Sequence, residues 1–131
     1  MMKTTSEGNL HILGIGSDII EIERIKRSIA KHGVTFLNKI FTEKEILYCQ
    51  RHQFSARHFA ARFAAKEAIA KALGTGIGKH LEWQDIEILN NSLGKPEVFL
   101  SEKAFDFFKK PKILLTLSHC KSLATATAIY F

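Results

Sequence analysis

Apolar and small residues follow a helical pattern most clearly between positions 55 and 73. This segment is rich in alanine and contains no glycine or proline, so its composition predicts a long helix. Gly74 follows directly and predicts the end of that helix. At about 100° per residue, Glu67 projects on the apolar, small-residue side of the helix, which makes it a candidate functional residue. A structural explanation stays open as well, because Glu67 and Lys71 could form an i,i+4 ion pair.

A second apolar stretch lies near the start of the chain. Residues 10–16 are almost entirely apolar and predict a buried strand that ends at Ser17. The isoleucines that follow repeat at helical spacing and predict a helix over 19–31. Ser17 or Asp18 is the expected N-cap of this helix, and the carboxylate of Asp18 could cap the helix, could be presented into a cleft, or could do both with different oxygens.

The rest of the chain predicts shorter elements. We expect Gly33 to end the first helix and Thr42 with Glu45 to form the capping box of a later one. The other expected elements are a short helix over 34–40, strands over 83–89 and 96–100, a brief helix from Ser101, and strands over 112–118 and 124–131. This order predicts an α+β domain, in which an antiparallel sheet packs with a long central helix and the helices lie on one side.

The size and composition of the chain favour one folded domain. Its 131 residues predict a polar N-terminal extension over 1–9 and a single domain over 10–131. Hydrophobic residues make up 46% and charged residues 24%, which argues against general disorder. The sequence shows no membrane span and no signal peptide, so we expect a cytoplasmic protein. Cys49 and Cys120 are far apart and predict neither a disulfide nor a zinc site, and we expect Cys120 to be buried and inert.

The charge of the chain indicates an acidic partner. The net charge is +6, which suits nucleic acid, a phosphorylated small molecule, an acidic protein or an anionic membrane. No zinc finger and no aromatic-interleaved basic stretch is present, so nucleic acid is not indicated. Arg24, Arg27 and Lys31 recur at i, i+3 and i+7 on the predicted first helix. This basic stripe is either a solvated face that matches the helix dipole or a docking face for an acidic helix.

Other candidate groups carry weaker signals. The loop Gly74-Thr75-Gly76 could offer backbone N–H groups to a phosphate, although it follows a helix and therefore differs from a P-loop. The same loop is explained equally by a helix C-cap and a turn. His52 and His58 have no spacing typical of metal ligands, so we interpret them as surface residues. Asp18 and Glu67 come from separate elements and could converge on a divalent cation.

Taken in order, these motifs resemble those of holo-acyl-carrier-protein synthases, the small bacterial-type 4'-phosphopantetheinyl transferases. The resemblance spans nearly the whole chain from Leu10, and its most specific part is the Asp18 motif together with Lys-Glu-x-x-x-Lys at this separation. The matching segments are 15–19 with Arg24, Phe41-Thr42-Glu43 with Glu45, 62–68 with Lys71, Gly74-Thr75-Gly76, Gly94-Lys95-Pro96 and Ser118-His119.

The resemblance implies transfer of 4'-phosphopantetheine from coenzyme A to a serine of apo-acyl carrier protein, in support of fatty acid biosynthesis. It implies Mg²⁺ and a homotrimer with sites between subunits, and no nucleic acid or membrane partner. The implied catalytic residues are Asp18, Glu67 and Lys71, with Asp18 and Glu67 as the metal ligands. The implied coenzyme A contacts are Arg62, Lys66, Lys71, Gly74, Thr75, Gly76 and His119, and the implied carrier contact is Arg24. Arg27 and Lys31 are predicted to join Arg24 at the carrier because they continue its basic stripe.

Two points stay open at this stage. The proton of the serine hydroxyl could pass to Glu67 or to a metal-bound water. Two alternatives to the transferase remain. A basic nucleic-acid-binding module would explain the net charge, but it gives Glu67 no role. A trimeric scaffold that has lost its catalytic activity would give no role to Asp18, Glu67 or Lys71.

Overall fold

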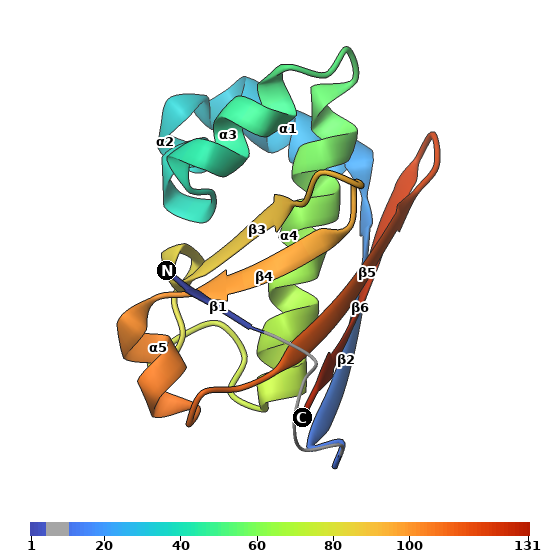
Figure 1. The fold of residues 1–131 in the computed structure, drawn as a ribbon. Coiled ribbons are helices and arrows are strands. Elements are labelled where there is room, and N and C mark those ends of the chain that lie inside the picture. Colours follow the sequence, from blue (N-terminus) through green and yellow to red (C-terminus); the bar gives the residue numbers. More distant parts are fainter. Residues whose placement is uncertain (5–10) are drawn as a thin grey trace.

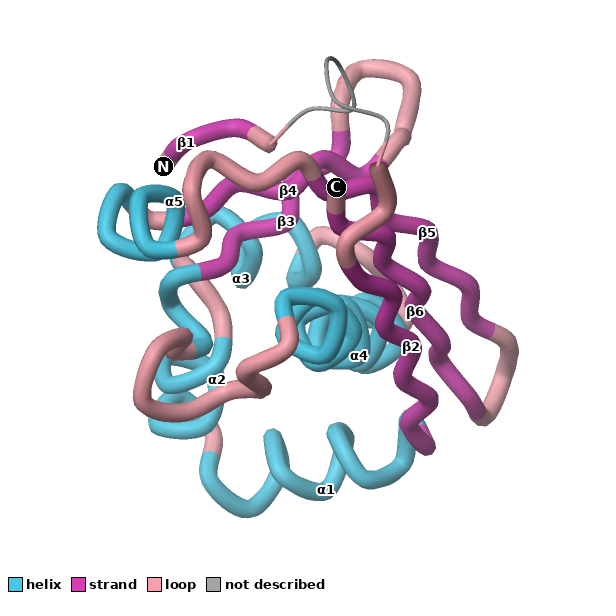
Figure 2. Tube along the Cα trace, turned by 90° about the horizontal axis from the view of Figure 1, so that it is seen from below, coloured by secondary structure: helices cyan, strands magenta, loops and turns pink. Residues whose placement is uncertain are grey.

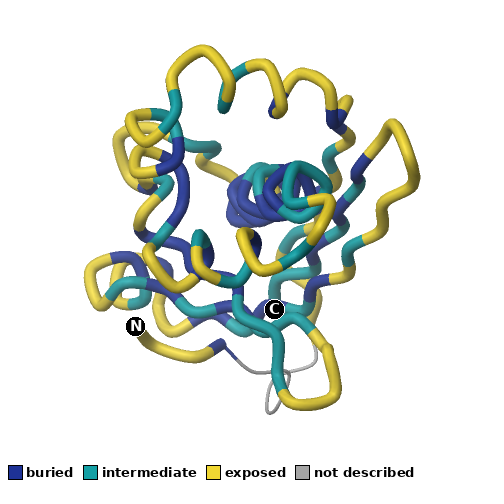
Figure 3. The backbone as a smooth tube through the Cα atoms, turned by 90° about the horizontal axis from the view of Figure 1, so that it is seen from above, coloured by how far each residue is buried: buried dark blue, intermediate teal, exposed yellow. Residues whose placement is uncertain are grey.

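Helix α4 (Ser55–Leu73) runs through the middle of the molecule, as the prediction required. The computed structural model describes residues 1–4 and 11–131, and Figure 2 looks along α4, which the other elements surround. Figure 3 shows the same helix as the most buried part of the trace. Between residues 59 and 73 the positions that are not buried are Phe63, Glu67 and Lys71, which are spaced by four. They therefore form a single face of the helix.

Two antiparallel three-stranded sheets pack around α4 (Figure 1). One has the order β2-β6-β5 and the other β1-β4-β3. The strands are β1 (Met2–Lys3), β2 (Gly14–Glu21), β3 (Ile86–Asn90), β4 (Pro96–Leu100), β5 (Ile113–His119) and β6 (Leu123–Tyr130). The α+β class is confirmed, but the strands form two sheets where one was predicted.

The shorter helices gather at the two ends of this arrangement. Figure 1 shows α1 (Ile22–His32), α2 (Val34–Ile40) and α3 (Glu43–Gln50) near the start of α4, and α5 (Glu102–Phe107) beside the β1-β4-β3 sheet. The strand that was predicted over 83–89 begins later, because its first three residues form a 3-10 turn, η1 (Trp83–Asp85). The capping box is confirmed, since Thr42 N donates to Glu45 Oε1 at 2.8 Å and Thr42 Oγ1 accepts from Glu45 N at 3.4 Å. None of the helices in the described ranges is long and apolar enough to cross a membrane.

The boundary between β2 and α1 differs from the prediction. Asp18 lies inside β2 opposite Ala126, and α1 begins only at Ile22. The N-cap of α1 is Glu21, and its side chain makes no capping hydrogen bond, so the prediction of Asp18 as N-cap is wrong. Ile19 pairs with Thr125 and is 62% exposed on the outer face of the sheet. Its apolar side chain fits the helical spacing of the isoleucines that follow, which is why the sequence predicted a helix here. The residue is instead in a strand because its backbone pairs with β6. The predicted start of this strand, Leu10, lies outside the described residues.

Two glycines allow β2 to lie directly against α4. A Cβ atom at Gly14 would overlap the carbonyl oxygen of Ala72, and one at Gly16 would overlap that of Ala68. The alanines of α4 present the matching shallow surface. Because successive residues of a strand alternate between faces, Asp18 lies on the same face of β2 as Gly14 and Gly16, and therefore toward α4.

The N-terminal residues contribute to the fold. β1 pairs with β4, and Lys3 forms an ion pair with Glu97 at 2.7 Å. Thr4 is buried, and its Oγ1 donates to the carbonyl of Val98 at 2.9 Å. The extension predicted over 1–9 therefore supplies residues 2–4 to the domain, and residues 5–9 lie outside the described part.

The two cysteines have opposite environments, and both are free. Burial raises the pKa of the Cys49 thiol to about 12. Cys120 is exposed, in contrast to the buried thiol that was predicted, and hydrogen bonds from the backbone of Ser122 and Leu123 lower its pKa. The reason is its position just after β5, in the turn that leads to β6.

Candidate active site

The contact between β2 and α4 brings together the three residues that sequence reasoning assigned to catalysis. Lys71 Nζ donates to Asp18 Oδ1 at 3.2 Å and to the carbonyl oxygen of Ser17 at 3.0 Å. Lys71 therefore forms its ion pair with Asp18 on the neighbouring strand, in place of the Glu67 pair considered from the sequence. Glu67 lies one helical turn before Lys71 on the half-exposed face of α4.

The electrostatic environment of Glu67 links it to Asp18. Burial raises the pKa of Glu67, and the nearby carboxylate of Asp18 raises it further, while Lys71 opposes the shift. Because Asp18 pairs with Lys71, which lies one helical turn after Glu67, both acids belong to the same part of the contact between β2 and α4. A pair of acids that repel each other loses this penalty when a cation binds between them.

The donor set of this pair suits Mg²⁺. The ion prefers oxygen ligands, and it is commonly held by one or two carboxylates while substrate phosphates and water complete its coordination. Within residues 1–4 and 11–131, no group of three or more His, Cys, Asp or Glu side chains is arranged to hold a metal. Asp18 and Glu67 therefore fit a metal that is shared with a phosphorylated substrate better than one held by the protein alone.

Lys66 lies in the interior, although the resemblance placed it at the coenzyme A phosphates. Its side chain is fully buried, and Nζ forms an ion pair with Glu45 Oε1 at 2.8 Å. Nζ also donates to the carbonyl oxygens of Ile40 at 2.8 Å and Trp83 at 3.1 Å. With three acceptors inside the protein, the ammonium is not available to a phosphate in this structure. Burial lowers the pKa of Lys66, against the opposing effect of Glu45.

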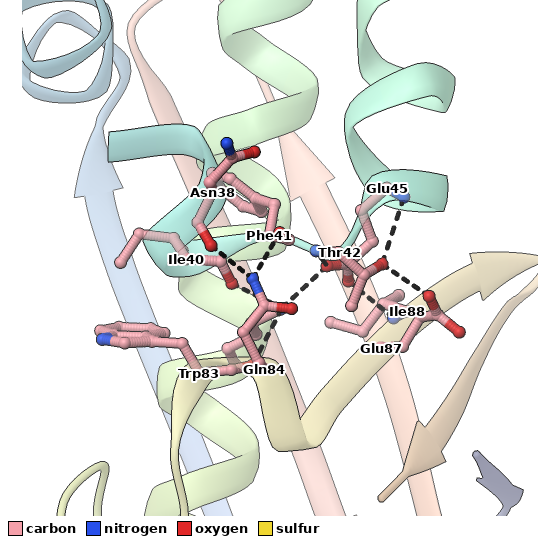
Figure 4. A network of polar contacts seen from close by, with 10 residues as sticks. Asn38, Ile40, Phe41, Thr42, Glu45, Trp83, Gln84, Glu87 and Ile88 are labelled. Atoms are coloured by element: carbon pink, nitrogen blue, oxygen red, sulfur yellow. Dashed lines mark hydrogen bonds and ion pairs between the residues drawn. The ribbon is translucent and has the colours of Figure 1, made fainter. Parts of the chain in front are cut away.

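Figure 4 shows the polar network around the partner of Lys66. Glu45 Oε2 accepts from the backbone N–H of Ile88 at 2.8 Å, while Oε1 accepts from Thr42 N. Thr42 Oγ1 donates to Glu87 Oε2 at 2.5 Å. Gln84 completes the network, because its Nε2 donates to the carbonyls of Asn38 and Phe41 at 2.7 and 2.6 Å. This network fixes α2, α3 and β3 relative to α4.

The glycine-rich loop after α4 mainly caps the helix. Gly74 and Gly76 have φ angles of 91° and 68°, and both donate their N–H groups to the carbonyl of Ala70. These two amides are therefore occupied, as the C-cap interpretation of the loop requires. Thr75 is exposed between them, and its hydroxyl donates to the carbonyl of Gly76 at 3.0 Å.

Arg62 and His119 lie on either side of a group of aromatic rings. The Arg62 guanidinium lies 4.2 Å from the centre of the Tyr48 ring, and its Nη2 donates to Asn90 Oδ1 at 2.8 Å. Its buried Nε has no hydrogen-bond partner among the described residues. His119 is the last residue of β5, not a turn residue as predicted, and its ring is 5.3 Å from that of His58.

His52 and His58, which were interpreted as surface residues, are half-buried, and their rings stack on each other at 3.8 Å. Sequence spacing gave no sign of this contact, because His52 lies in the turn before α4 and His58 lies within the helix.

A cavity of about 760 Å³ opens between α1, the start of α4 and the turn from β5 to β6. Ile22, Ile29 and Ala56 contribute apolar surface, and charges of both signs line the cavity, from Glu21, Glu23, Lys26, Arg57 and Lys121. Arg24, Arg27 and Lys31 are all exposed on α1, but none of them lines the cavity, which the helix borders with Ile22, Glu23, Lys26 and Ile29. Sequence reasoning identified the basic stripe but not the cavity, which is formed by segments far apart in the chain.

The outer face of the β2-β6-β5 sheet carries apolar side chains toward solvent. Ile15 is 67% exposed and pairs across β6 with Ile129, which in turn pairs with Leu114 on β5. The next row along the outer face is Ser17, Thr127 and Thr116. No described element of the chain covers Ile15 and Ile19, which stay exposed.

Comparisons with known proteins agree with the fold of the chain. The model of the 4'-phosphopantetheinyl transferase superfamily matches residues 14–128. A holo-[acyl-carrier-protein] synthase from Protochlamydia amoebophila is 52% identical over 118 residues, which cover 90% of this chain and 97% of the relative. The holo-[acyl-carrier-protein] synthase structure from Neisseria meningitidis aligns with a TM-score of 0.86 at 34% identity, covering 92% and 99% of the two chains. The corresponding Helicobacter pylori structure, in complex with coenzyme A, has a TM-score of 0.83 at 32% identity and covers 89% and 99%.

Proposed function

Because the chain belongs to the 4'-phosphopantetheinyl transferase superfamily, we infer that it is a holo-acyl-carrier-protein synthase that serves fatty acid biosynthesis. It transfers 4'-phosphopantetheine from coenzyme A to a serine hydroxyl of apo-acyl carrier protein. The serine oxygen forms a bond to the β-phosphorus, the bond to the α-phosphate breaks, and adenosine 3',5'-bisphosphate leaves. The observation that carries the proposal is the contact of β2 with α4, which places Asp18 beside Lys71 and within electrostatic reach of Glu67.

Mg²⁺ is the metal that we propose for this site, with Asp18 and Glu67 as the residues that hold it. When bound, the ion would neutralise charge on the two phosphates between which the bond breaks. Burial and, to a lesser extent, repulsion from Asp18 raise the pKa of Glu67, and the part that is due to Asp18 would be relieved by a cation, which supports this assignment.

The chain's own side chains supply the remaining functions in this proposal. Lys71, half-exposed and paired with Asp18, places a positive charge beside the site and can contact a phosphate oxygen. The carboxylate of Glu67 lies at the same site, and it is the group that we propose as acceptor of the serine proton. Arg62, His119 and the exposed hydroxyl of Thr75 are the groups that we assign to the nucleotide part of coenzyme A.

The carrier protein is proposed to dock on α1. Acyl carrier proteins are acidic, and Arg24, Arg27 and Lys31 present exposed positive charge on this helix. Opposite charges of this kind raise the association rate and lose their effect as salt increases. The rate of modification at low carrier concentration should therefore fall with ionic strength, and a rate that is independent of salt would remove the stripe from the docking surface.

A homotrimer, with the site between subunits, is the assembly that we propose. The apolar outer face of β2-β6-β5 supports it, because exposed Ile15 and Ile19 lie on the strand that also carries Asp18. Light scattering during gel filtration would test it, and a mass of one chain would exclude an inter-subunit site. The cytoplasm remains our expectation for localisation, and the two free thiols are consistent with a reducing compartment.

The decisive experiment is intact mass spectrometry of apo-acyl carrier protein incubated with the enzyme, coenzyme A and Mg²⁺. We expect a mass gain of one phosphopantetheine that disappears when EDTA is added. Glu67→Gln and Asp18→Asn should each reduce the rate by roughly a thousandfold, because each removes a charge that acts on the transition state. Circular dichroism of both variants should remain that of the wild type.

Two results would contradict the proposal. If several carriers gain no mass with a folded wild-type protein, the transferase assignment fails. If the Glu67→Gln enzyme retains full Mg²⁺-dependent activity, the metal assignment fails while the transferase assignment stands.

A further inference from the structure

Four aromatic rings contact one another in a row between α3 and the end of β5. The Tyr48 ring lies 4.7 Å from that of His52, which stacks on His58 at 3.8 Å with an angle of 30°. His58 then meets His119 edge to face, at 5.3 Å and 70°. The proposed function uses only His119 from this row, so the roles of the other two histidines are open.

The row is fixed at its inner end. His52 Nδ1 lies 2.9 Å from the carbonyl oxygen of Tyr48, and because a carbonyl only accepts, Nδ1 is the donor. The Arg62 guanidinium covers the Tyr48 ring at 4.2 Å. Tyr48, His52 and His58 are all at least half-buried. The first three rings therefore form a rigid support that ends at His58.

His119 is at the free end of the row. It is exposed and closes β5, next to a turn whose residues 120–122 are also exposed. An exposed side chain of this kind samples several rotamers, and a ligand must restrict it to one of them when it binds. The edge contact with His58 restricts the ring of His119 before any ligand arrives.

The charges around His58 favour a neutral ring. Its titratable neighbours are His52 in the turn, Tyr48 on α3, His119 on β5, and Arg57 and Arg62 on α4, with no carboxylate among those that act on it. Burial is the main reason that the pKa of His58 falls to about 4, and the neighbouring cationic groups lower it further. At neutral pH His58 therefore offers an uncharged ring for packing.

We propose that His58 is a positioning residue, whose ring holds His119 in the orientation that binds the nucleotide part of coenzyme A, while His52 supports His58 from behind. The role rests on the proposed function, because it requires that His119 contacts coenzyme A. It adds a function for two residues that belong to no motif of the transferase.

Steady-state kinetics of two matched variants test the role. His58→Ala removes the ring, whereas His58→Phe keeps a ring and removes its nitrogens. We expect His58→Ala to raise the KM for coenzyme A by roughly threefold to tenfold, with kcat and the KM for the carrier unchanged. His58→Phe should stay close to the wild type. A purely structural role would instead lower kcat, or affect both substrates together.

The outcome that overturns the role is equally clear. If His58→Ala leaves the KM for coenzyme A unchanged, or if both variants raise it equally, ring packing on His119 does not position that residue.

A second measurement separates this inference from the proposed function. In the free protein, NMR of the histidine rings should show ring-current shifts on His119, with the signal assigned by its absence in His119→Ala. His58→Ala should move the His119 signals toward random-coil values, and unmoved signals would refute the contact. This measurement needs no coenzyme A, so a wild type that fails to modify any carrier would refute the transferase while the contact is tested independently.

Discussion

Two lysines on α4, five positions apart, form ion pairs of opposite kinds. Lys66 is fully buried and pairs with Glu45 at 2.8 Å. Lys71 is 52% exposed in its side chain and pairs with Asp18 at 3.2 Å. The same residue type on one helix therefore serves the interior in one case and the candidate site in the other.

The two ammonium groups differ in how many of their protons have a hydrogen-bond acceptor. The ammonium of Lys66 has three acceptors, from Glu45, Ile40 and Trp83, which match its three protons. The ammonium of Lys71 has two, both on β2, and it lies beside a second acid, Glu67, whose pKa is raised. A fully satisfied charge stabilises one conformation, while an incompletely satisfied one can still bind a ligand.

The largest effect that separates the two lysines should come from Lys66→Met. Removal of one partner leaves the Glu45 carboxylate buried without its counter-charge, which costs about 3–5 kcal/mol of the free energy of unfolding. Urea denaturation measures this loss. The double variant with Glu45→Gln should recover part of it, since no unpaired charge then remains, and Lys79→Met provides an exposed-lysine control. If Lys66→Met were as stable as that control, the interior pair would not hold the fold together.

Lys71→Met should have a small effect on stability and a large effect on activity. The exposed pair contributes about 0–1 kcal/mol to the free energy of unfolding, so the denaturation midpoint should move little. The value of kcat/KM for coenzyme A should fall roughly a hundredfold, because a charge near the phosphates is lost. The comparison would be refuted by a Lys71→Met enzyme that is as destabilised as Lys66→Met, or by one that keeps its activity.

The smallest effect, and the one that sharpens the comparison, is the pH dependence of Glu67→Gln. The pKa of Glu67 is raised in the folded chain. Its protonated carboxyl therefore contributes favourably to the free energy of unfolding below the ordinary pKa near 4.5, and this contribution is lost as pH rises through the raised pKa. At pH 7 the ionised acid beside Asp18 therefore opposes folding. Calorimetry should find Glu67→Gln at least as stable as the wild type at pH 7, with the difference shrinking toward pH 4. A variant that is less stable at pH 7 would mean that Glu67 supports the fold.

Local signals in the sequence predicted the elements whose ends are set locally. The Thr42 and Glu45 capping box, the stop at Gly33 and the stop at Gly74 depend on side chains and φ angles within a few residues, so the pattern alone was sufficient. The start of α1 could not be predicted in this way, because Ile19 faces outward from a sheet whose partner strand lies more than a hundred residues later along the chain.

The residues of the candidate site fall into the same two groups, those that the sequence identifies and those whose position depends on distant segments. Asp18 and Glu67 could be named from their types and positions, Lys71 was assigned by the resemblance, and the structure brings Lys71 to Asp18. The interior position of Lys66 could not be read from the sequence, since it depends on Glu45, Ile40 and Trp83 in three other segments. The histidine row escaped prediction for the same reason, because a turn, a helix and a strand each supply one ring.

The position of β2 at the edge of its sheet has a consequence for local unfolding. β2 pairs only with β6 among the described strands, so its amides can open to solvent at a lower free energy than those of the central α4. Asp18 would then separate from Glu67 while the core stays folded. A ligand that bridges the two acids binds only the closed form, and it should therefore slow hydrogen exchange in β2 far more than in α4.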